Sequence, residues 1–156
     1  MTVTFARATA ADAEALVKLQ VLAFHDDARV YPGVQLGGPP GYDSVEATLE
    51  KIRVDDFYKI LYEGQIVGGL AVFDLGQGHF HLDVIFIDPA QHSRGIGTQA
   101  MHFIERTYPA KKWTLNTPAY ATRNHHFYEK FGYVKVGEEI LEETTGIMLL
   151  DYEKRL

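Results

Sequence analysis

The sequence predicts an α+β protein with a mixed, largely antiparallel central sheet flanked by helices. Several apolar, strand-like segments follow one another through short turns, as in the pair joined by Glu63-Gly64, and such hairpins build antiparallel sheets. Segments with helical spacing separate the other strands, and they are too few to connect a fully parallel sheet. The expected order is β-α-α-β-β-β-α-β-α-β-β.

The first part of the chain predicts one strand and two helices. A strand over residues 2–9 leads into a helix that starts at residues 9–11, where Asp12 follows Thr9 in a capping-box pattern. Leu16, Leu19 and Ala23 give this helix an apolar stripe. A Gly- and Pro-rich loop over residues 31–43, too long for a simple connector, precedes a helix over residues 44–53.

The rest of the chain alternates strands and helices. We expect strands over residues 57–63, 65–74 and 79–88, a helix from the Gly95-Ile96-Gly97 segment to Pro109, a strand over 112–117, a helix over 121–132 and a hairpin with strands over 133–141 and 146–154. The pair Gly68-Gly69 inside the second of these strands predicts a bulge or a close approach of another chain segment.

Composition narrows the functional classes. The 156 residues contain no cysteine and fit a single domain over residues 1–156 that needs no disulfide. The formal charge of −6 argues against nucleic-acid binding, which usually requires a basic surface. No signal-peptide pattern opens the chain, and no apolar run approaches the roughly 18 residues that span a bilayer. We therefore expect a cytoplasmic protein with no nucleic-acid or membrane partner.

The segment "PAQHSRGIGTQAMHFI", residues 89–104, places two glycines one residue apart at the start of an amphipathic run. Glycine costs a helix roughly 0.5–1 kcal/mol relative to alanine, so two in a first turn indicate that another group approaches the backbone. The free N–H groups and the positive dipole end of such a helix favour an anion, typically a pyrophosphate. A ligand-free turn with helix-packing glycines is the alternative.

Two other nucleotide-binding motifs fit poorly. "GIGTQA" satisfies the dinucleotide fingerprint, but "PAQHSR" separates it from the preceding strand, and no acidic residue stands near residues 115–120 to hold a ribose. The chain that remains after Gly95 is too short for a second mononucleotide-binding half. No Gly-Lys-Ser/Thr follows, which excludes a Walker loop.

Two segments resemble the signatures of the GNAT acetyltransferases. "VIFIDPAQHSRGIGTQAMHFIE" is similar to their acetyl-CoA loop, with the pattern Gln/Arg-x-x-Gly-x-Gly/Ala after a Val-x-Pro-like strand end. "NHHFYEKFGYVKVGE" is similar to their second signature, a helix with a Phe-Tyr-Glu-Lys-x-Gly-Phe-like run. With the strand order, the resemblance covers essentially the whole chain. It implies the GNAT acyl-CoA N-acyltransferase fold and an N-acetyltransferase that uses acetyl-CoA as cosubstrate, without a metal.

The resemblance implies a set of cofactor-binding residues. Backbone amides of the loop hold the CoA pyrophosphate, and the strand before it pairs with the pantetheine arm. Position 92 departs from the family pattern because it carries His in place of Gln or Arg, and Asn124 stands near the position of a family asparagine that is Ala121 here. The expected cofactor-binding residues are Ile85, Phe86, Ile87, His92, Ser93, Arg94, Gly95, Ile96, Gly97, Thr98, Asn124 and Tyr128.

The resemblance also implies the catalytic residues. Tyr128 matches the family tyrosine that protonates the departing CoA thiolate; a core tyrosine that only packs is the alternative. His81 occupies the place of a family glutamate and is the expected base, with an apparent pKa of about 6–7.5. Asp83 shares its strand face if no bulge intervenes, and it would orient or replace the imidazole. A hydrogen-bonded or solvated pair of His79 and His81, or a metal site completed by His25, are the other interpretations.

The expected reaction is direct attack of a primary amine on acetyl-CoA in a ternary complex. A catalytically silent CoA-binding or sensor module of the same fold is the alternative, and use of a longer acyl group stays open. The acceptor is a small-molecule or peptide amine shaped by the loop over residues 30–42, and Asp26 and Asp27 would suit a cationic one. Whether the chain forms a homodimer is left open.

Overall fold

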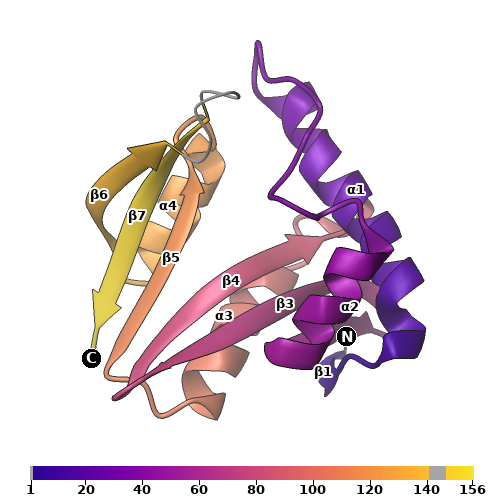
Figure 1. Ribbon diagram of the computed structural model, residues 1–156. Coiled ribbons are helices and arrows are strands. Elements are labelled where there is room, and N and C mark those ends of the chain that lie inside the picture. Colours follow the sequence, from indigo (N-terminus) through magenta and orange to yellow (C-terminus); the bar gives the residue numbers. More distant parts are fainter. Residues whose placement is uncertain (1, 141–146) are drawn as a thin grey trace.

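The computed structural model describes residues 2–140 and 147–156. These residues form one seven-stranded sheet in the order β1-β2-β3-β4-β5-β7-β6 (Figure 1). Its neighbouring strands are antiparallel except β4 and β5, which run parallel. The sheet is therefore mixed and largely antiparallel, as predicted. The strands are β1 (Val3–Arg7), β2 (Asp56–Tyr62), β3 (Gln65–Gly76), β4 (His79–Ile87), β5 (Lys112–Pro118), β6 (Val134–Ile140) and β7 (Met148–Arg155).

Helices cover both faces of the sheet. Helices α1 and α2 lie on one face and α3 and α4 on the other (Figure 1). Two short 3-10 turns precede α1 and α3, and the remaining order is the predicted one. None of the helices in the described ranges is long and apolar enough to cross a membrane. The helical elements are η1 (Ala10–Asp12), α1 (Ala13–Val30), α2 (Val45–Val54), η2 (Pro89–Gln91), α3 (Ile96–Thr107) and α4 (Thr122–Lys130).

Helix α1 is longer than its apolar stripe predicts. The capping box forms as expected, because Oδ2 of Asp12 accepts a hydrogen bond from the Thr9 backbone N–H at 2.8 Å. The helix then continues to Val30, and Arg29 pairs with Asp26 one turn earlier at 2.7 Å. The acidic segment at residues 26–27 thus lies inside the helix, and not in the loop that follows.

The sheet separates two hydrophobic cores. The larger core, under α3 and α4, contains the fully buried side chains of Ile60, Leu70 and Trp113. The smaller core, under α1, contains Leu16 and Phe57. Burial on both faces explains why β3 reads as a nearly continuous apolar run.

The Gly68-Gly69 pair in β3 provides both features that the sequence predicts. A Cβ at position 68 would lie 2.2 Å from the carbonyl oxygen of Phe86, and one at position 69 would lie 2.6 Å from its ring. The pairing of β2 with β3 shifts beside the glycines, between Ile60 and Leu61, as in a bulge. Strand β4 can therefore lie close against β3.

The strands of both predicted hairpins pair as expected. Glu63 and Gly64 both have positive φ, 50° and 83°, as the first hairpin requires. The terminal hairpin forms between β6 and β7. The predicted ends of its strands at Leu141 and Gly146 lie outside the described residues.

Candidate active site

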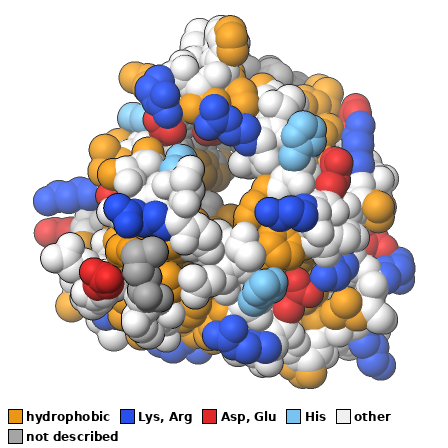
Figure 2. All heavy atoms as spheres, turned by 180° about the vertical axis from the view of Figure 1, so that it is seen from behind, with side chains coloured by type: hydrophobic (Ala, Val, Ile, Leu, Met, Phe, Trp, Pro, Cys, Tyr) orange, Lys and Arg blue, Asp and Glu red, His pale blue; other side chains and the backbone are white. Residues whose placement is uncertain are grey.

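The parallel strands β4 and β5 pair at one end only. Their pairing runs from His79 opposite Lys112 to His81 opposite Thr114, and beyond it the strands diverge into a V (Figure 1). Residues 85–87 remain paired with β3, but no β5 partner is found for them in the described chain. Seen from behind, the surface is hollowed near its centre (Figure 2). An extended ligand can add to such a free strand edge.

A bulge lies where the strands separate. Strand β3 pairs Ala71 with Val84 and the next residue, Val72, with Leu82, so Asp83 is the extra residue of β4. A bulge re-aims the side chains near it and increases the local twist. His81 and Asp83 would share a face for certain only on a regular strand, so across this bulge the side-chain contacts decide where Asp83 points.

The glycine-rich loop ends at the mouth of the V. Gly95 caps α3 with φ of 74°, and Ser93 also has a positive φ of 69°. A Cβ at position 95 would meet no atom within 4 Å, whereas one at Gly97 would lie 3.2 Å from Cζ of Phe127 in α4. Gly95 therefore serves the backbone conformation, and Gly97 allows close packing of α3 against α4.

The first turn of α3 presents free amides. The N–H groups of Ile96, Gly97 and Thr98 precede the first intrahelical bond, which runs from Gln99 to Gly95. Residues 92–95 are exposed. Ile96 is buried, and Gly97 and Thr98 are half-buried. Free amides at the positive end of a helix dipole, next to an exposed loop, form an anion-binding site.

Two loop side chains have defined neighbours. Arg94 donates a hydrogen bond to the Tyr62 hydroxyl at 3.1 Å, and its guanidinium lies 5.3 Å from the centre of that ring. Arg29, and to a lesser extent His92, lower the pKa of Asp26 in α1. The loop therefore carries positive charge that is held in place at the mouth of the V.

The predicted residues of α4 lie on the opposite arm of the V. Asn124 donates from Nδ2 to Oγ1 of Thr117 at 3.1 Å, which ties the start of α4 to the end of β5. Tyr128 is buried in the larger core, where its ring contacts Tyr133 and Tyr152. Its hydroxyl makes no hydrogen bond within the described ranges, and burial raises its pKa, so the phenol stays protonated at neutral pH.

His79 and His81 share one hydroxyl group. Nε2 of His79 and Nδ1 of His81 each lie 2.8 Å from Oγ1 of Thr114 in β5. Burial lowers the pKa of both imidazoles, and Lys112 lowers that of His79 further. His81 is thus a partly buried, neutral imidazole at the last paired position before the strands separate.

Asp83 does not orient the imidazole of His81 as the sequence analysis expects. Its carboxylate pairs with Nζ of Lys51 in α2 at 2.7 Å, while Thr114 holds the His81 ring. The buried carboxyl of Asp55 lies beside this pair, and burial together with Asp83 raises its pKa to about 6. Asp83 remains on the same side of the sheet as His81 and favours the charged imidazole at longer range.

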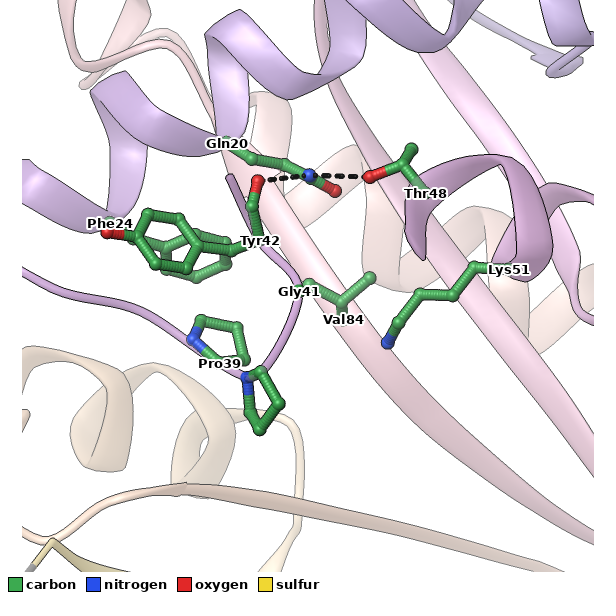
Figure 3. Close-up of a pocket in the computed structure, with 9 residues that line it drawn as sticks. Gln20, Phe24, Pro39, Gly41, Tyr42, Thr48, Lys51 and Val84 are labelled. Carbon is green, nitrogen blue, oxygen red and sulfur yellow. Dashed lines mark hydrogen bonds between the residues drawn. The ribbon is translucent and has the colours of Figure 1, made fainter. Parts of the chain in front are cut away.

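The loop before α2 is anchored to α1. Nε2 of Gln20 donates to the carbonyl of Tyr42 at 2.7 Å and to Oγ1 of Thr48 at 3.2 Å, beside a small pocket that Lys51 also lines (Figure 3). The ring of His25 hydrogen-bonds the Tyr42 hydroxyl at 2.6 Å. His25 is thus engaged with the loop, and the described residues hold no group of three or more metal-ligating side chains.

The end of α1 touches the opposite arm. The Tyr120 hydroxyl donates to Oδ2 of Asp27 at 3.2 Å, and the rings of Tyr31 and Tyr120 are 5.4 Å apart. Asp26 is neutralised by Arg29, but Asp27 has no cationic partner in the part of the chain that the structure describes. Burial raises the pKa of the Asp27 carboxyl, and the hydrogen bond from Tyr120 opposes this shift.

Sequence reasoning missed Thr114 and Lys51. Each acts through a contact with a residue far along the chain: Thr114 with His81, and Lys51 with Asp83. Threonine in a strand and lysine in a helix are ordinary surface choices, so no local signal marks them. Only the pairing of β4 with β5 and the packing of α2 reveal them.

The fold and the glycine loop define an acetyltransferase of the GNAT class. The family model of the acetyltransferase (GNAT) domain matches residues 42–156, and the chain belongs to this family. The resemblance inferred from the two signature segments is thereby confirmed.

The comparisons with individual proteins agree with this class. The uncharacterized protein YrkN of Bacillus subtilis (strain 168) is 41% identical over 73 residues, which are 46% of this chain and 40% of that protein. The chain thus spans less than half the length of this curated relative. Solved structures also share the fold, among them those of two acetyltransferases.

An acetyltransferase from Thermus thermophilus has a TM-score of 0.78 at 18% identity, covering 100% of this chain and 98% of that one. The PaiA N-acetyltransferase from Thermoplasma acidophilum, solved with coenzyme A, has a TM-score of 0.75 at 15% identity, and the match covers 100% of both chains.

Proposed function

We propose that this protein transfers the acetyl group of acetyl-CoA to a primary amine by direct attack in a ternary complex. The observation that carries the proposal is the junction of two binding features at the mouth of the V. The edge of β4 at residues 85–87, which lacks a β5 partner in the described chain, leads through a short 3-10 turn and the exposed loop at residues 92–95 to the free amides at the start of α3. A ligand with an extended amide-bearing arm and a pyrophosphate needs this combination.

The cofactor occupies the two features together. Backbone groups of residues 85–87 pair with the pantetheine arm, as an added strand pairs with a sheet edge. The amides of residues 92–98 bind the pyrophosphate, and Arg94, held on Tyr62, adds positive charge beside them. The solved PaiA N-acetyltransferase, which holds coenzyme A, has the same fold.

The chemistry needs one base and one acid. An alkyl amine is protonated at neutral pH, so it must lose a proton before its nitrogen attacks the thioester carbon. His81 is neutral and accepts this proton, directly or through a water. The amine nitrogen forms the C–N bond at the thioester carbon, the C–S bond then breaks, and Tyr128 donates its phenolic proton to the departing thiolate. The nitrogen loses its second proton, which restores the phenol of Tyr128, and His81 releases the first proton to solvent. An N–H freed where β4 and β5 separate would polarise the carbonyl.

The acceptor is a cationic amine. The formal charge of the chain is −6, and Asp27 stands near the mouth with no cationic partner in the described ranges. At the bulge of β4 one lysine, Lys51, faces the two carboxyls of Asp55 and Asp83. Negative groups around a site attract a cationic substrate and raise its local concentration. Small-molecule amines and peptide amino termini both meet this description.

A silent CoA-binding module of the same fold is the second candidate. One observation favours it: Tyr128 is packed in the hydrophobic core, with 7% of its surface exposed. A tyrosine that serves only packing would occupy the same position. This candidate shares the cofactor site and lacks the transfer step.

Calorimetry and a transfer assay test the two candidates. Acetyl-CoA should bind with measurable heat and raise the melting temperature, as a ligand selective for the native state does. The purified protein is then given acetyl-CoA and a panel of polyamines, amino sugars and peptides, and thiol release is followed. No heat and no thermal shift at millimolar acetyl-CoA would overturn both candidates. Binding without thiol release on any amine would leave the silent module.

A further inference from the structure

The bridge between His79, Thr114 and His81 constrains where their protons lie. A threonine hydroxyl has a single proton to donate, and a neutral imidazole has one N–H and one bare nitrogen. Both imidazoles are 2.8 Å from Oγ1 of Thr114, and the described part of the chain offers the hydroxyl proton no other acceptor, so the hydroxyl keeps all its protein hydrogen bonds when it donates to one ring and accepts from the other. Two arrangements do this; in a third, the hydroxyl accepts from both rings and gives its own proton to water.

In the first arrangement, Thr114 donates to Nε2 of His79 and accepts from the Nδ1–H of His81. The Nε2 of His81 then carries the lone pair and can take a proton from a substrate. In the second arrangement, Thr114 donates to Nδ1 of His81, which places the His81 proton on Nε2 and leaves no free lone pair there. His81 can therefore act as a base when Thr114 accepts from its Nδ1–H, as in the first arrangement, and not when Thr114 donates to it, as in the second.

The same count of donors and acceptors at Thr114 makes the charge of one imidazole depend on the charge of the other. A protonated imidazole carries N–H on both nitrogens, so it can only donate to Thr114. A cationic His79 therefore excludes the first arrangement, and a cationic His81 excludes the second. Protonation of both rings would make the hydroxyl accept from both and would place two positive charges side by side, so protonation of one ring disfavours protonation of the other.

The surrounding charges favour the first arrangement. His79 faces Lys112 of β5 and Arg155 and Glu153 of β7, and burial followed by Lys112 lowers its pKa, which keeps it neutral. His79 also lines an open cleft of about 540 Å³ with Lys111, Lys112 and Arg155. His81 faces His79, Asp83 of β4 and Asp151 of β7; burial lowers its pKa, while the two carboxylates favour its cation. Positive charge is therefore better placed on His81.

We propose that His79 and Thr114 are positioning residues that hold His81 as the Nδ1–H tautomer, with its Nε2 lone pair free to accept the proton of the acceptor amine. This inference rests on the proposed role of His81 as the base. The hydroxyl of Thr114 carries the effect from His79 to His81.

The tautomer of His81 can be determined by NMR, without an assay of enzyme activity. Protein labelled with ¹⁵N in its histidine rings is examined at pH 8 by long-range proton–nitrogen correlation, and His79→Gln and His81→Gln identify the two signals. We expect Nδ1 of His81 to be protonated and its Nε2 bare, and the same tautomer for His79. His126, exposed on α4, is the internal control. A proton on Nε2 of His81 would overturn the proposal even if the protein proves to be an acetyltransferase.

Two replacements of Thr114 separate positioning from packing. Thr114→Val keeps the shape of the side chain and removes the hydroxyl, while Thr114→Ser keeps the hydroxyl. In Thr114→Val, His81 should lose its single tautomer, and kcat should fall by about 3–10-fold, the effect of one hydrogen bond, with the KM for acetyl-CoA unchanged. Thr114→Ser should restore both. An unaltered His81 spectrum in Thr114→Val would contradict the bridge.

The charge around His79 gives an independent test. Lys112→Met removes the nearest cation from His79, so His79 should take up a proton at higher pH than in the parent protein. Because a cationic His79 excludes the first arrangement and leaves the Thr114 proton free to point at Nδ1 of His81, His81 should then shift toward the tautomer with its proton on Nε2 as the pH falls. The ¹⁵N titration detects this exchange. Independent titration of the two rings would overturn the coupling.

Discussion

Lys51 reaches from α2 to the bulge of β4, where its Nζ lies 2.7 Å from Oδ2 of Asp83. The buried carboxyl of Asp55 shares this position, so one lysine faces two acidic side chains. Burial and the neighbouring Asp83 disfavour a second negative charge, and the pKa of Asp55 rises to about 6. This cluster ties α2 to the strand that carries His81.

Stability should fall as the pH rises through this pKa. The carboxyl of Asp55 has a higher pKa in the folded chain, about 6, than its ordinary value of 3.8, so the folded state binds more protons than the unfolded state between these values. The cost of ionising it is absent near pH 4 and fully present above pH 6. Asp55→Asn should therefore stabilise the protein by about 1–3 kcal/mol at pH 8 and far less at pH 4.

Denaturant unfolding of the parent and of Asp55→Asn between pH 4 and pH 8 measures this difference. Asp43→Asn, which removes an exposed carboxylate from the loop before α2, is the control. A stability difference that is the same at both pH values would show that the Asp55 carboxyl does not titrate as inferred.

Gly97→Arg should abolish acetyl-CoA binding. A Cβ at this position already lies 3.2 Å from Phe127, so the longer side chain must turn outward across the free amides of α3. Gly37→Arg is the matched control, because a Cβ there meets no atom within 4 Å and the residue is remote from α3 in sequence. Calorimetry with acetyl-CoA compares the two, with circular dichroism to check folding. Parental affinity in a folded Gly97→Arg protein would place the pyrophosphate elsewhere.

Tyr128→Phe should lower turnover by about 10²–10⁴-fold with little change in acetyl-CoA affinity, if Tyr128 protonates the thiolate. Phenylalanine keeps the ring contacts with Tyr133 and Tyr152 and removes only the proton donor. Tyr133→Phe is the matched control, since its buried hydroxyl has no hydrogen-bond partner within the described ranges. Steady-state kinetics of both variants give the answer. An unchanged rate in Tyr128→Phe would assign that tyrosine to packing alone.

His81→Gln should remove the rising limb of the pH–rate profile. The imidazole must be neutral to accept a proton, so the rate climbs as the pH rises through its pKa, which burial lowers below 6.5. The midpoint of the rising limb should therefore lie below the ordinary histidine pKa of 6.5. His126→Gln, a change on the exposed side of α4, should keep the parental profile. A His81→Gln enzyme with the same limb would move the role to Asp83 or to solvent.

Much of the architecture could be predicted from local patterns. The turn at Glu63-Gly64 and the capping box at Thr9 depend on residues near one another in the chain, and the adjacent glycines at 68 and 69 signal a close approach although the group that approaches, Phe86, is distant in sequence. The order of helices and strands follows from the same signals. Positive φ, helix capping and strand alternation are properties of short segments, so a sequence reveals them directly.

The length of α1 and the partner of Asp83 were not predictable in this way. The apolar stripe of α1 ends near Ala23, but the helix continues to Val30, where Arg29 and Asp26 pair and Tyr31 follows. Asp83 forms an ion pair with Lys51, which lies 32 positions earlier in the chain. These outcomes depend on which elements pack together, and a single segment carries no record of that.

The sequence by itself determined the element order, the glycine-rich start of α3 and the two segments that resemble GNAT signatures. Only the tertiary structure decided that β4 and β5 pair for three residues and then diverge, and that Thr114 joins His79 to His81. The Thr114–His81 contact spans 33 positions and crosses all of α3. Parallel strands must meet through such a crossover, so their register is set by how the helix packs on the sheet and not by any neighbouring residue.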